Sequence, residues 1–274
     1  MKHRTVGKIA IGAVGILFCL YSILTPLQSR LTTDMQYLKA PANAAMLAAP
    51  IAEPNPGSTS SIKIHIAEAE TQCWEKLRNE GTDPDQNVTI ADLEQMVAQA
   101  SPLIAQELGL SRANLPPIKF VDPNKPNNYF FNRIGIREPL QLAWTKNAAY
   151  HEAVHAQIVA ESLYKMPVHL AFGRFTDKFG GPANETFTEV VTYEVLATQA
   201  LEGDRLAECS FLRGMHWDTS VLMRGEAGET LTGDEQDYQA KPASIVLQAL
   251  KGNTMYKGVE LDSVAKLLSE MFLD

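Results

Sequence analysis

The feature that most constrains this chain is segment 150–156, Tyr-His-Glu-Ala-Val-His-Ala, which contains the pattern His-Glu-x-x-His. On an α-helix, residues four apart lie on one face with Cβ atoms about 5–6 Å apart. His151 and His155 can therefore offer two imidazole nitrogens to one Zn²⁺, at roughly 2.0–2.1 Å each. Glu152 lies beside such a metal rather than on it, where its carboxylate can take a proton from metal-bound water.

The neighbours of this pattern argue against a solvated surface helix. They are small or apolar residues: Ala148, Ala149, Ala156, Ile158 and Val159. Polar side chains in such surroundings are seldom buried without a partner, and a metal ion is one such partner. The segment therefore predicts a helix that carries a zinc site on one face.

The cysteines and the net charge narrow the kind of site and partner. Cys19, Cys73 and Cys209 form no Cys-x-x-Cys pair, so a zinc site built from cysteines is not supported. The net charge of −8 makes nucleic acid an unsuitable partner. The 274 residues give room for one sizeable domain, or two small ones, plus appendages.

The N-terminus has the layout of a signal sequence or signal anchor. Residues 9–27 carry no charge, and basic residues precede them in the tail 1–8. This length is close to the ~20 residues that span a bilayer. Ala42-Asn43-Ala44 suits a signal peptidase but lies well beyond the apolar run, so we expect an uncleaved transmembrane anchor. The basic end then stays in the cytoplasm of a bacterial inner membrane, and the rest is exported to the periplasm or beyond.

Residues 28–61 are rich in Ala and Pro, and their last part has no apolar period. They predict an extended linker, with the folded domain at 62–274. Export places Cys73 and Cys209 in an oxidising compartment, where a disulfide between them is a reasonable expectation. Two free buried thiols are the alternative.

Helices are expected in the first part of the domain. One is predicted over 62–80, and a second is capped at its start by Thr89. Ser101-Pro102 is predicted to restart the helix, since Ser suits an N-cap and Pro the first helical position, and Gly109 ends it.

Short strands are expected next. Segment 118–121 follows two prolines, and 129–134 and 140–145 can pair as a hairpin around Gly135 and Pro139. A peptide substrate can lie extended along an edge strand such as 140–145. An ordinary core strand is the alternative for that segment.

A catalytic zinc usually takes three protein ligands and leaves one position for water. The segment after Gly181-Pro182 predicts a second helix, because its apolar residues recur at helical spacing: Phe187, Val190, Val191, Val195 and Leu196. Glu185 lies in its first turn and is the candidate third ligand. Glu189, one turn later, can accept the second ring N–H of a ligating His. Glu189 and Glu194 are the alternative ligands.

His-Glu-x-x-His followed by Asn-Glu-x-x-Thr-Glu at 184–189 resembles the gluzincin metallopeptidases. The resemblance covers about forty residues and two motifs. It implies that His151, His155 and Glu185 are zinc ligands. It further implies that Glu152 is the general base and that Glu189 is the acid behind a ligating His.

Hydrolysis also needs a donor that stabilises the developing oxyanion. Segment 214–218, Gly-Met-His-Trp-Asp, resembles the Gly-Val-His segment that supplies such a histidine in thermolysin-like enzymes. His216 is therefore a candidate. Tyr164, Tyr193 and Tyr238 are the alternatives.

The C-terminal part combines a polar loop with two helices. Residues 224–240 are rich in Gly, Glu and Asp and predict a surface loop. We expect this loop to lie over the active-site cleft. Calcium binding by its acids is disfavoured because the spacing of an EF-hand is absent. Segments 242–250 and 261–272 predict amphipathic helices.

Together these patterns predict an α+β, zincin-like fold: a small mixed sheet, an active-site helix and a mostly helical C-terminal half, behind an N-terminal transmembrane helix. The expected function is a membrane-anchored zinc peptidase that acts on a peptide or protein substrate. Two other classes remain open. One is a zinc-containing envelope protein for binding or assembly, and the other is a structural domain in which the motif is accidental.

Overall fold

The structure is a computed structural model, and it describes residues 56–110, 113, 117–121, 128–129, 134–137, 141–165 and 182–272. The predicted tail 1–8, anchor 9–27 and most of the linker lie outside the described residues, so these remain predictions. Within the described ranges, no helix combines the length and apolar character that a membrane span requires. Residues Glu53–Asp274 form one compact unit.

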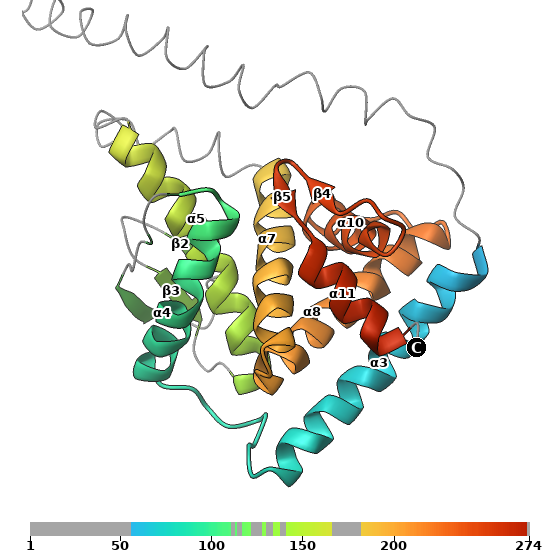
Figure 1. Ribbon diagram of the computed structural model, residues 1–274, viewed down its shortest axis with the longest axis horizontal. Coiled ribbons are helices and arrows are strands. Elements are labelled where there is room, and N and C mark those ends of the chain that lie inside the picture. Colours follow the sequence, from blue (N-terminus) through green and yellow to red (C-terminus); the bar gives the residue numbers. More distant parts are fainter. Residues whose placement is uncertain are drawn as a thin grey trace, which may run out of the picture. The chain divides into compact units, whose positions relative to one another are not determined.

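The part of this unit that the structure describes is mostly helical, with two small sheets (Figure 1). Its helices are α3 (Pro56–Asn79), α4 (Ile90–Glu107), α5 (Leu142–Lys165), α7 (Pro182–Leu201), α8 (Arg205–Glu226), α9 (Gly233–Glu235), the π-helix η2 (Gln236–Ala240), α10 (Lys241–Ala249) and α11 (Asp262–Phe272). Its strands are β1 (Ile118–Val121), β2 (Asn128–Tyr129), β3 (Ile134–Arg137), β4 (Met255–Tyr256) and β5 (Val259–Glu260). Helix α7 contacts α5, α8, α10 and α11, and so lies at the centre of the helices.

The three-stranded sheet has the order β1-β3-β2, with β3 parallel to β1 and antiparallel to β2. The strand predicted at 118–121 is confirmed, but the hairpin between 129–134 and 140–145 is wrong. The chain is helical from Leu142 onward. Its buried positions there, Leu142, Lys146, Ala149 and Ala153, recur every three or four residues, which is the period of a helix. Residues 142–145 therefore form no edge strand for a substrate.

The start of the first helix differs from the prediction, and the start of the second agrees with it. Helix α3 begins at Pro56, so the linker predicted over 28–61 ends earlier. A proline is tolerated in the first turn because its missing N–H has no partner to lose there. The start of α4 is as predicted, because the Thr89 side chain accepts a hydrogen bond from Asp92 N and the Asp92 carboxylate accepts one from Thr89 N.

Helix α4 does not restart at Ser101-Pro102 but runs through Pro102 without a break. One face of α4 buries residues on both sides of that point: Leu93, Val97, Ala100, Ile104 and Ala105. The packing of this continuous face offsets the hydrogen bond that the proline removes. Gly109 follows the helix with φ +62°, so the helix ends where the glycine predicted it.

The loop predicted over 224–240 is wrong. Helix α8 continues to Glu226, and α9 and η2 cover residues 233–240. The signal for the second helical start is a capping box, in which Thr232 and Glu235 bond reciprocally through side chain and backbone N–H. Arg224 adds an ion pair to Glu235. The two C-terminal helices are confirmed as α10 and α11.

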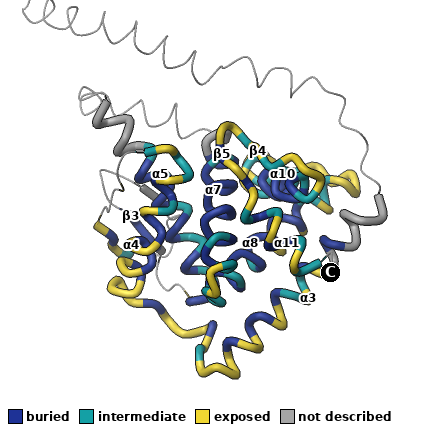
Figure 2. The backbone as a smooth tube through the Cα atoms, viewed as in Figure 1, coloured by how far each residue is buried: buried dark blue, intermediate teal, exposed yellow. Residues whose placement is uncertain are grey.

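The core contains an unusual set of polar side chains. Figure 2 shows α7 buried along most of its length. Its buried polar residues are Glu185, Thr186, Thr188, Glu189, Thr192, Glu194 and Gln199. Acidic side chains are rarely buried unless they are paired, so we expect a functional site along α7.

A disulfide joins Cys73 of α3 to Cys209 of α8, with the two Cα atoms 5.5 Å apart. It bridges residues 136 positions apart in the sequence. A cross-link over so long a loop stabilises mainly by restricting the unfolded chain. It holds α3 against α8, the helix that carries Gly214 and His216.

Candidate metal centre

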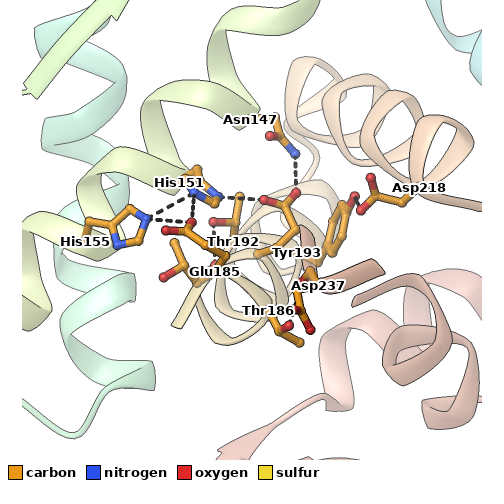
Figure 3. Close-up of polar contacts among 11 residues, drawn as sticks. Asn147, His151, His155, Glu185, Thr186, Thr192, Tyr193, Asp218 and Asp237 are labelled. Carbon is orange, nitrogen blue, oxygen red and sulfur yellow. Dashed lines mark hydrogen bonds and ion pairs between the residues drawn. The ribbon is translucent and has the colours of Figure 1, made fainter. Parts of the chain in front are cut away.

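Two helices supply the centre. His151 and His155 lie one turn apart on α5, and Glu185 lies in the first turn of α7. The two helices pack against each other, so the imidazoles of α5 face the first turns of α7 (Figure 3).

Three donor atoms converge in a small triangle. Glu185 Oε2 is 3.1 Å from His151 Nε2 and 3.0 Å from His155 Nε2, and the two imidazole nitrogens are 3.2 Å apart. Four bonds of roughly 2.0–2.1 Å in tetrahedral directions place neighbouring donors about 3.3 Å apart. The triangle therefore has the size that one tetrahedral zinc ion requires of three of its ligands.

Glu189 fixes the orientation of the first histidine. Its Oε2 accepts a hydrogen bond of 2.7 Å from His151 Nδ1, and its Oε1 accepts one of 3.2 Å from Asn147 Nδ2. A proton held on Nδ1 leaves the Nε2 lone pair directed at the triangle. Carboxylates in this position commonly set the tautomer of a ligating histidine and raise its basicity.

The charges of the cluster call for a cation. No Lys or Arg of the described ranges forms an ion pair with Glu152, Glu185 or Glu189. Burial acts to lower the pKa of His151, but hydrogen bonds to Glu185 and Glu189 raise it well above its ordinary value. Burial acts to raise the pKa of Glu185, but hydrogen bonds with the two histidines outweigh it and lower the pKa. A divalent ion at the triangle would supply the positive charge that these carboxylates otherwise take from a protonated His151.

Glu152 lies next to the triangle on α5 and is buried. Burial raises the pKa of this carboxyl, and the charges of His151 and His155 partly offset the rise. A carboxylate whose proton affinity is increased in this way is suited to accept a proton from water.

Tyr238 of η2 covers one side of the centre. Its ring stacks on that of His151, with centroids 6.1 Å apart and planes 19° apart. Thr186 Oγ1 donates a hydrogen bond of 2.6 Å to the carbonyl of Asp237, which holds η2 against α7. Burial and the Glu185 carboxylate raise the pKa of Tyr238, so its hydroxyl remains a donor at neutral pH. From the sequence alone, Tyr238 is one of three tyrosines that are alternatives to His216 as the oxyanion donor.

The structure does not bring His216 to this centre. His216 lies on α8 with Nδ1 2.6 Å from Glu70 Oε2 of α3, and 46% of its side chain is exposed. Gly214 of that segment faces α5 and α7, since a Cβ there would lie 2.8 Å from Asn147 Nδ2 of α5 and 2.8 Å from the Tyr193 hydroxyl of α7. Two residues further along a helix is about 200° around its axis, so His216 faces elsewhere.

The alternative third ligand Glu194 is committed to another role. Its carboxylate accepts hydrogen bonds from the backbone N–H groups of Ser263, at 2.9 Å, and Val264, at 3.0 Å. It therefore caps the N-terminus of α11. Asn147, which the sequence analysis missed, lies four residues before His151 on the same helix face, and that spacing is the signal for it.

No protein family, curated protein or solved structure matches this chain in sequence or fold.

Proposed function

We propose that this chain is a membrane-anchored, zinc-dependent peptidase. His151, His155 and Glu185 hold the metal, Glu152 is the general base and Glu189 orients His151. The observation that carries the proposal is the triangle of donor atoms 3.0–3.2 Å apart, with a buried glutamate beside it. The anchor and the exported location follow from the predicted segment 9–27.

Each residue of the centre has a separate role in the proposed hydrolysis. A zinc ion bound at the triangle would polarise the scissile carbonyl and lower the pKa of a bound water to about 7. Glu152 takes the proton of the attacking water and passes it to the leaving amine. Tyr238, which stacks on His151, is the donor that we assign to the developing oxyanion, in preference to His216.

The exposure of the ligands favours catalysis over a purely structural metal. The side chains of His151, His155 and Glu185 remain 12%, 14% and 10% exposed. Structural zinc sites have four protein ligands and are closed, whereas catalytic sites keep one position for water. Three converging donors that solvent can still reach fit the second kind.

The test is Glu152→Gln in the full-length chain, purified in detergent. We expect stoichiometric zinc to be retained and cleavage of a mixed peptide library, followed by mass spectrometry, to fall at least a hundredfold. Glu70→Gln is the matched control, because Glu70 is another buried glutamate and contacts none of the ligands. Undiminished cleavage by Glu152→Gln would refute the mechanism.

Two other outcomes identify the alternatives. Zinc bound at the three ligands without cleavage of any peptide by the wild type would favour a non-catalytic envelope protein for binding or assembly. Purified protein without stoichiometric zinc would mean that the motif is accidental.

A further inference from the structure

Helix α8 meets α5 and α7 at a buried glycine, Gly214. A Cβ there would lie 2.8 Å from Asn147 Nδ2 of α5, and 2.8 and 2.9 Å from the hydroxyl and Cε1 of Tyr193 on α7. Real Cβ atoms essentially never come within 3.0 Å of such atoms. A glycine in the middle of a helix is unfavourable relative to alanine, so its place here needs a reason. The close approach of three helices supplies one.

The two neighbours of this glycine are each held by a hydrogen bond (Figure 3). Asn147 Nδ2 donates to Glu189 Oε1 at 3.2 Å. The Tyr193 hydroxyl donates to Asp218 Oδ2 at 2.7 Å, and the Tyr193 ring packs edge-on against Phe211, with centroids 5.6 Å apart. Neither neighbour can move away from an added methyl group without straining its own contacts.

Asn147 reaches the metal centre through Glu189. Oε1 of this carboxylate accepts the hydrogen bond from Asn147, and Oε2 lies 2.7 Å from His151 Nδ1. Contacts at both oxygens fix the rotation of the carboxylate and keep Oε2 against the imidazole. The orientation of the ligating histidine therefore depends on the amide behind it.

We propose that Asn147 and Gly214 are positioning residues for the metal centre. Asn147 holds the Glu189 carboxylate in the orientation that directs His151 Nε2 at the metal. Gly214 lets α8 pack against the Asn147 amide and keep it in place. The inference rests on the proposed zinc site and extends its support from α5 and α7 to α8.

The expected effect is smaller than that of losing Glu189 itself. Loss of the carboxylate behind a metal-ligating histidine typically costs roughly 10–100-fold in metal affinity. Asn147 supports one of the two oxygens of that carboxylate, so loss of its hydrogen bond should cost about three- to tenfold.

The experiment measures the zinc dissociation constant of the full-length chain by competition with a chromophoric chelator. The variants are Asn147→Leu, which keeps similar bulk without a donor, and Gly214→Ala. Gly225→Ala is the matched control for the glycine. It makes the same change in the same helix, but the added Cβ would meet Cδ1 and Cγ of Leu231, at 2.8 and 3.4 Å. That contact is with the end of a flexible side chain, which can rotate away.

The matched control for Asn147 is Tyr150→Phe. It also removes a hydrogen bond between α5 and α7, because the Tyr150 hydroxyl donates to Gln199 Oε1 at 2.7 Å. This bond does not involve the ligands or Glu189. Thermal melts of the zinc-free proteins report what each change costs in stability.

Asn147→Leu and Gly214→Ala should each weaken zinc binding about three- to tenfold. Gly225→Ala and Tyr150→Phe should stay within about twofold of the wild type, whatever they do to the melting temperature. Asn147→Leu that loses no more affinity than Tyr150→Phe would overturn the inference. Gly214→Ala that loses no more than Gly225→Ala would overturn it too.

A double-mutant cycle separates positioning through Glu189 from general damage to the fold. In a chain that already carries Glu189→Ala, the Asn147 amide has no carboxylate to hold. Adding Asn147→Leu should then change the zinc dissociation constant by less than about twofold. A loss as large as that in the wild-type background would show that Asn147 acts by another route, which contradicts the inference.

Failure of the proposed function gives a different pattern. Wild-type protein that binds no zinc would overturn the metal centre and this inference together. Wild-type protein that binds zinc but cleaves no peptide would overturn the peptidase alone. Wild-type protein and Asn147→Leu with equal zinc affinity would overturn the inference alone.

Discussion

Two regions of this molecule place a histidine against a glutamate at nearly the same distance. His151 Nδ1 is 2.7 Å from Glu189 Oε2, and His216 Nδ1 is 2.6 Å from Glu70 Oε2. At Glu70 the charge is already paired, because its Oε1 accepts hydrogen bonds from Arg213 at 3.1 Å and from Trp74 at 3.2 Å. Half of the His216 side chain faces solvent.

The first region differs in what lies beyond the histidine. The other ring nitrogen of His151 faces Glu185 and His155, and the described residues offer these carboxylates no Lys or Arg. A histidine–glutamate contact is therefore not enough to define a metal site. The distinguishing features are a second ring nitrogen aimed at further donors and negative charge without a cationic side chain.

The largest difference between the two regions should appear when a histidine is replaced by phenylalanine. His155→Phe removes one of the three donors and should weaken zinc binding more than the roughly 10–100-fold that an outer carboxylate contributes. His216→Phe should leave zinc affinity within about twofold, because its partner is neutralised by Arg213. Metal analysis after dialysis against a weak chelator checks both, and equal losses would erase the distinction between the regions.

A smaller difference should follow replacement of the two glutamates by glutamine. Glu189→Gln should weaken zinc binding roughly 10–100-fold, since a neutral amide no longer fixes the Nδ1 proton of His151. Glu70→Gln should not change it. Competition with a chromophoric chelator measures both constants. A Glu70→Gln effect of the same size would show that the comparison reflects general damage to the fold.

The smallest expected effect concerns stability in the second region. Glu70→Gln leaves the guanidinium of Arg213, stacked 4.3 Å from the Trp144 ring centroid, without its carboxylate. We expect the free energy of unfolding to fall by about 1–3 kcal/mol, from loss of hydrogen bonds to a charged partner. Urea denaturation of the zinc-free protein measures it. No change in the denaturation midpoint would mean that the network around Glu70 is not structural.

The sequence predicts the centre better than it predicts the elements around it. His151, Glu152 and His155 are fixed relative to one another by one turn of helix, and Glu185 and Glu189 by one turn of another. The spacing of residues along the sequence therefore suffices to predict the arrangement within each helix. The sequence of residues 140–145 fits the alternating pattern of a strand as well as it fits a helix. The helical period becomes visible only in the structure, where Lys146 and Ala149, which follow this segment, are buried.

The incorrect predictions for His216 and for the loop 224–240 share a physical cause. Tertiary contacts decide between local structures that the sequence of a short segment allows equally well. The Gly-x-His segment at 214–216 does not reveal which face of α8 meets α5, and the close approach at Gly214 decides it. The capping box at Thr232 was the local signal for the helical turn that carries Tyr238, but the many acidic residues there favoured a loop.

The most direct test of the central claim is an anomalous-scattering map, collected at the zinc absorption edge from crystals grown with zinc. We expect one strong peak per chain. It should lie roughly 2.0–2.1 Å from Nε2 of both His151 and His155 and from an oxygen of Glu185, with a solvent molecule in the fourth position. A map with no peak at these atoms, or a peak closed by a fourth protein ligand, would contradict the account.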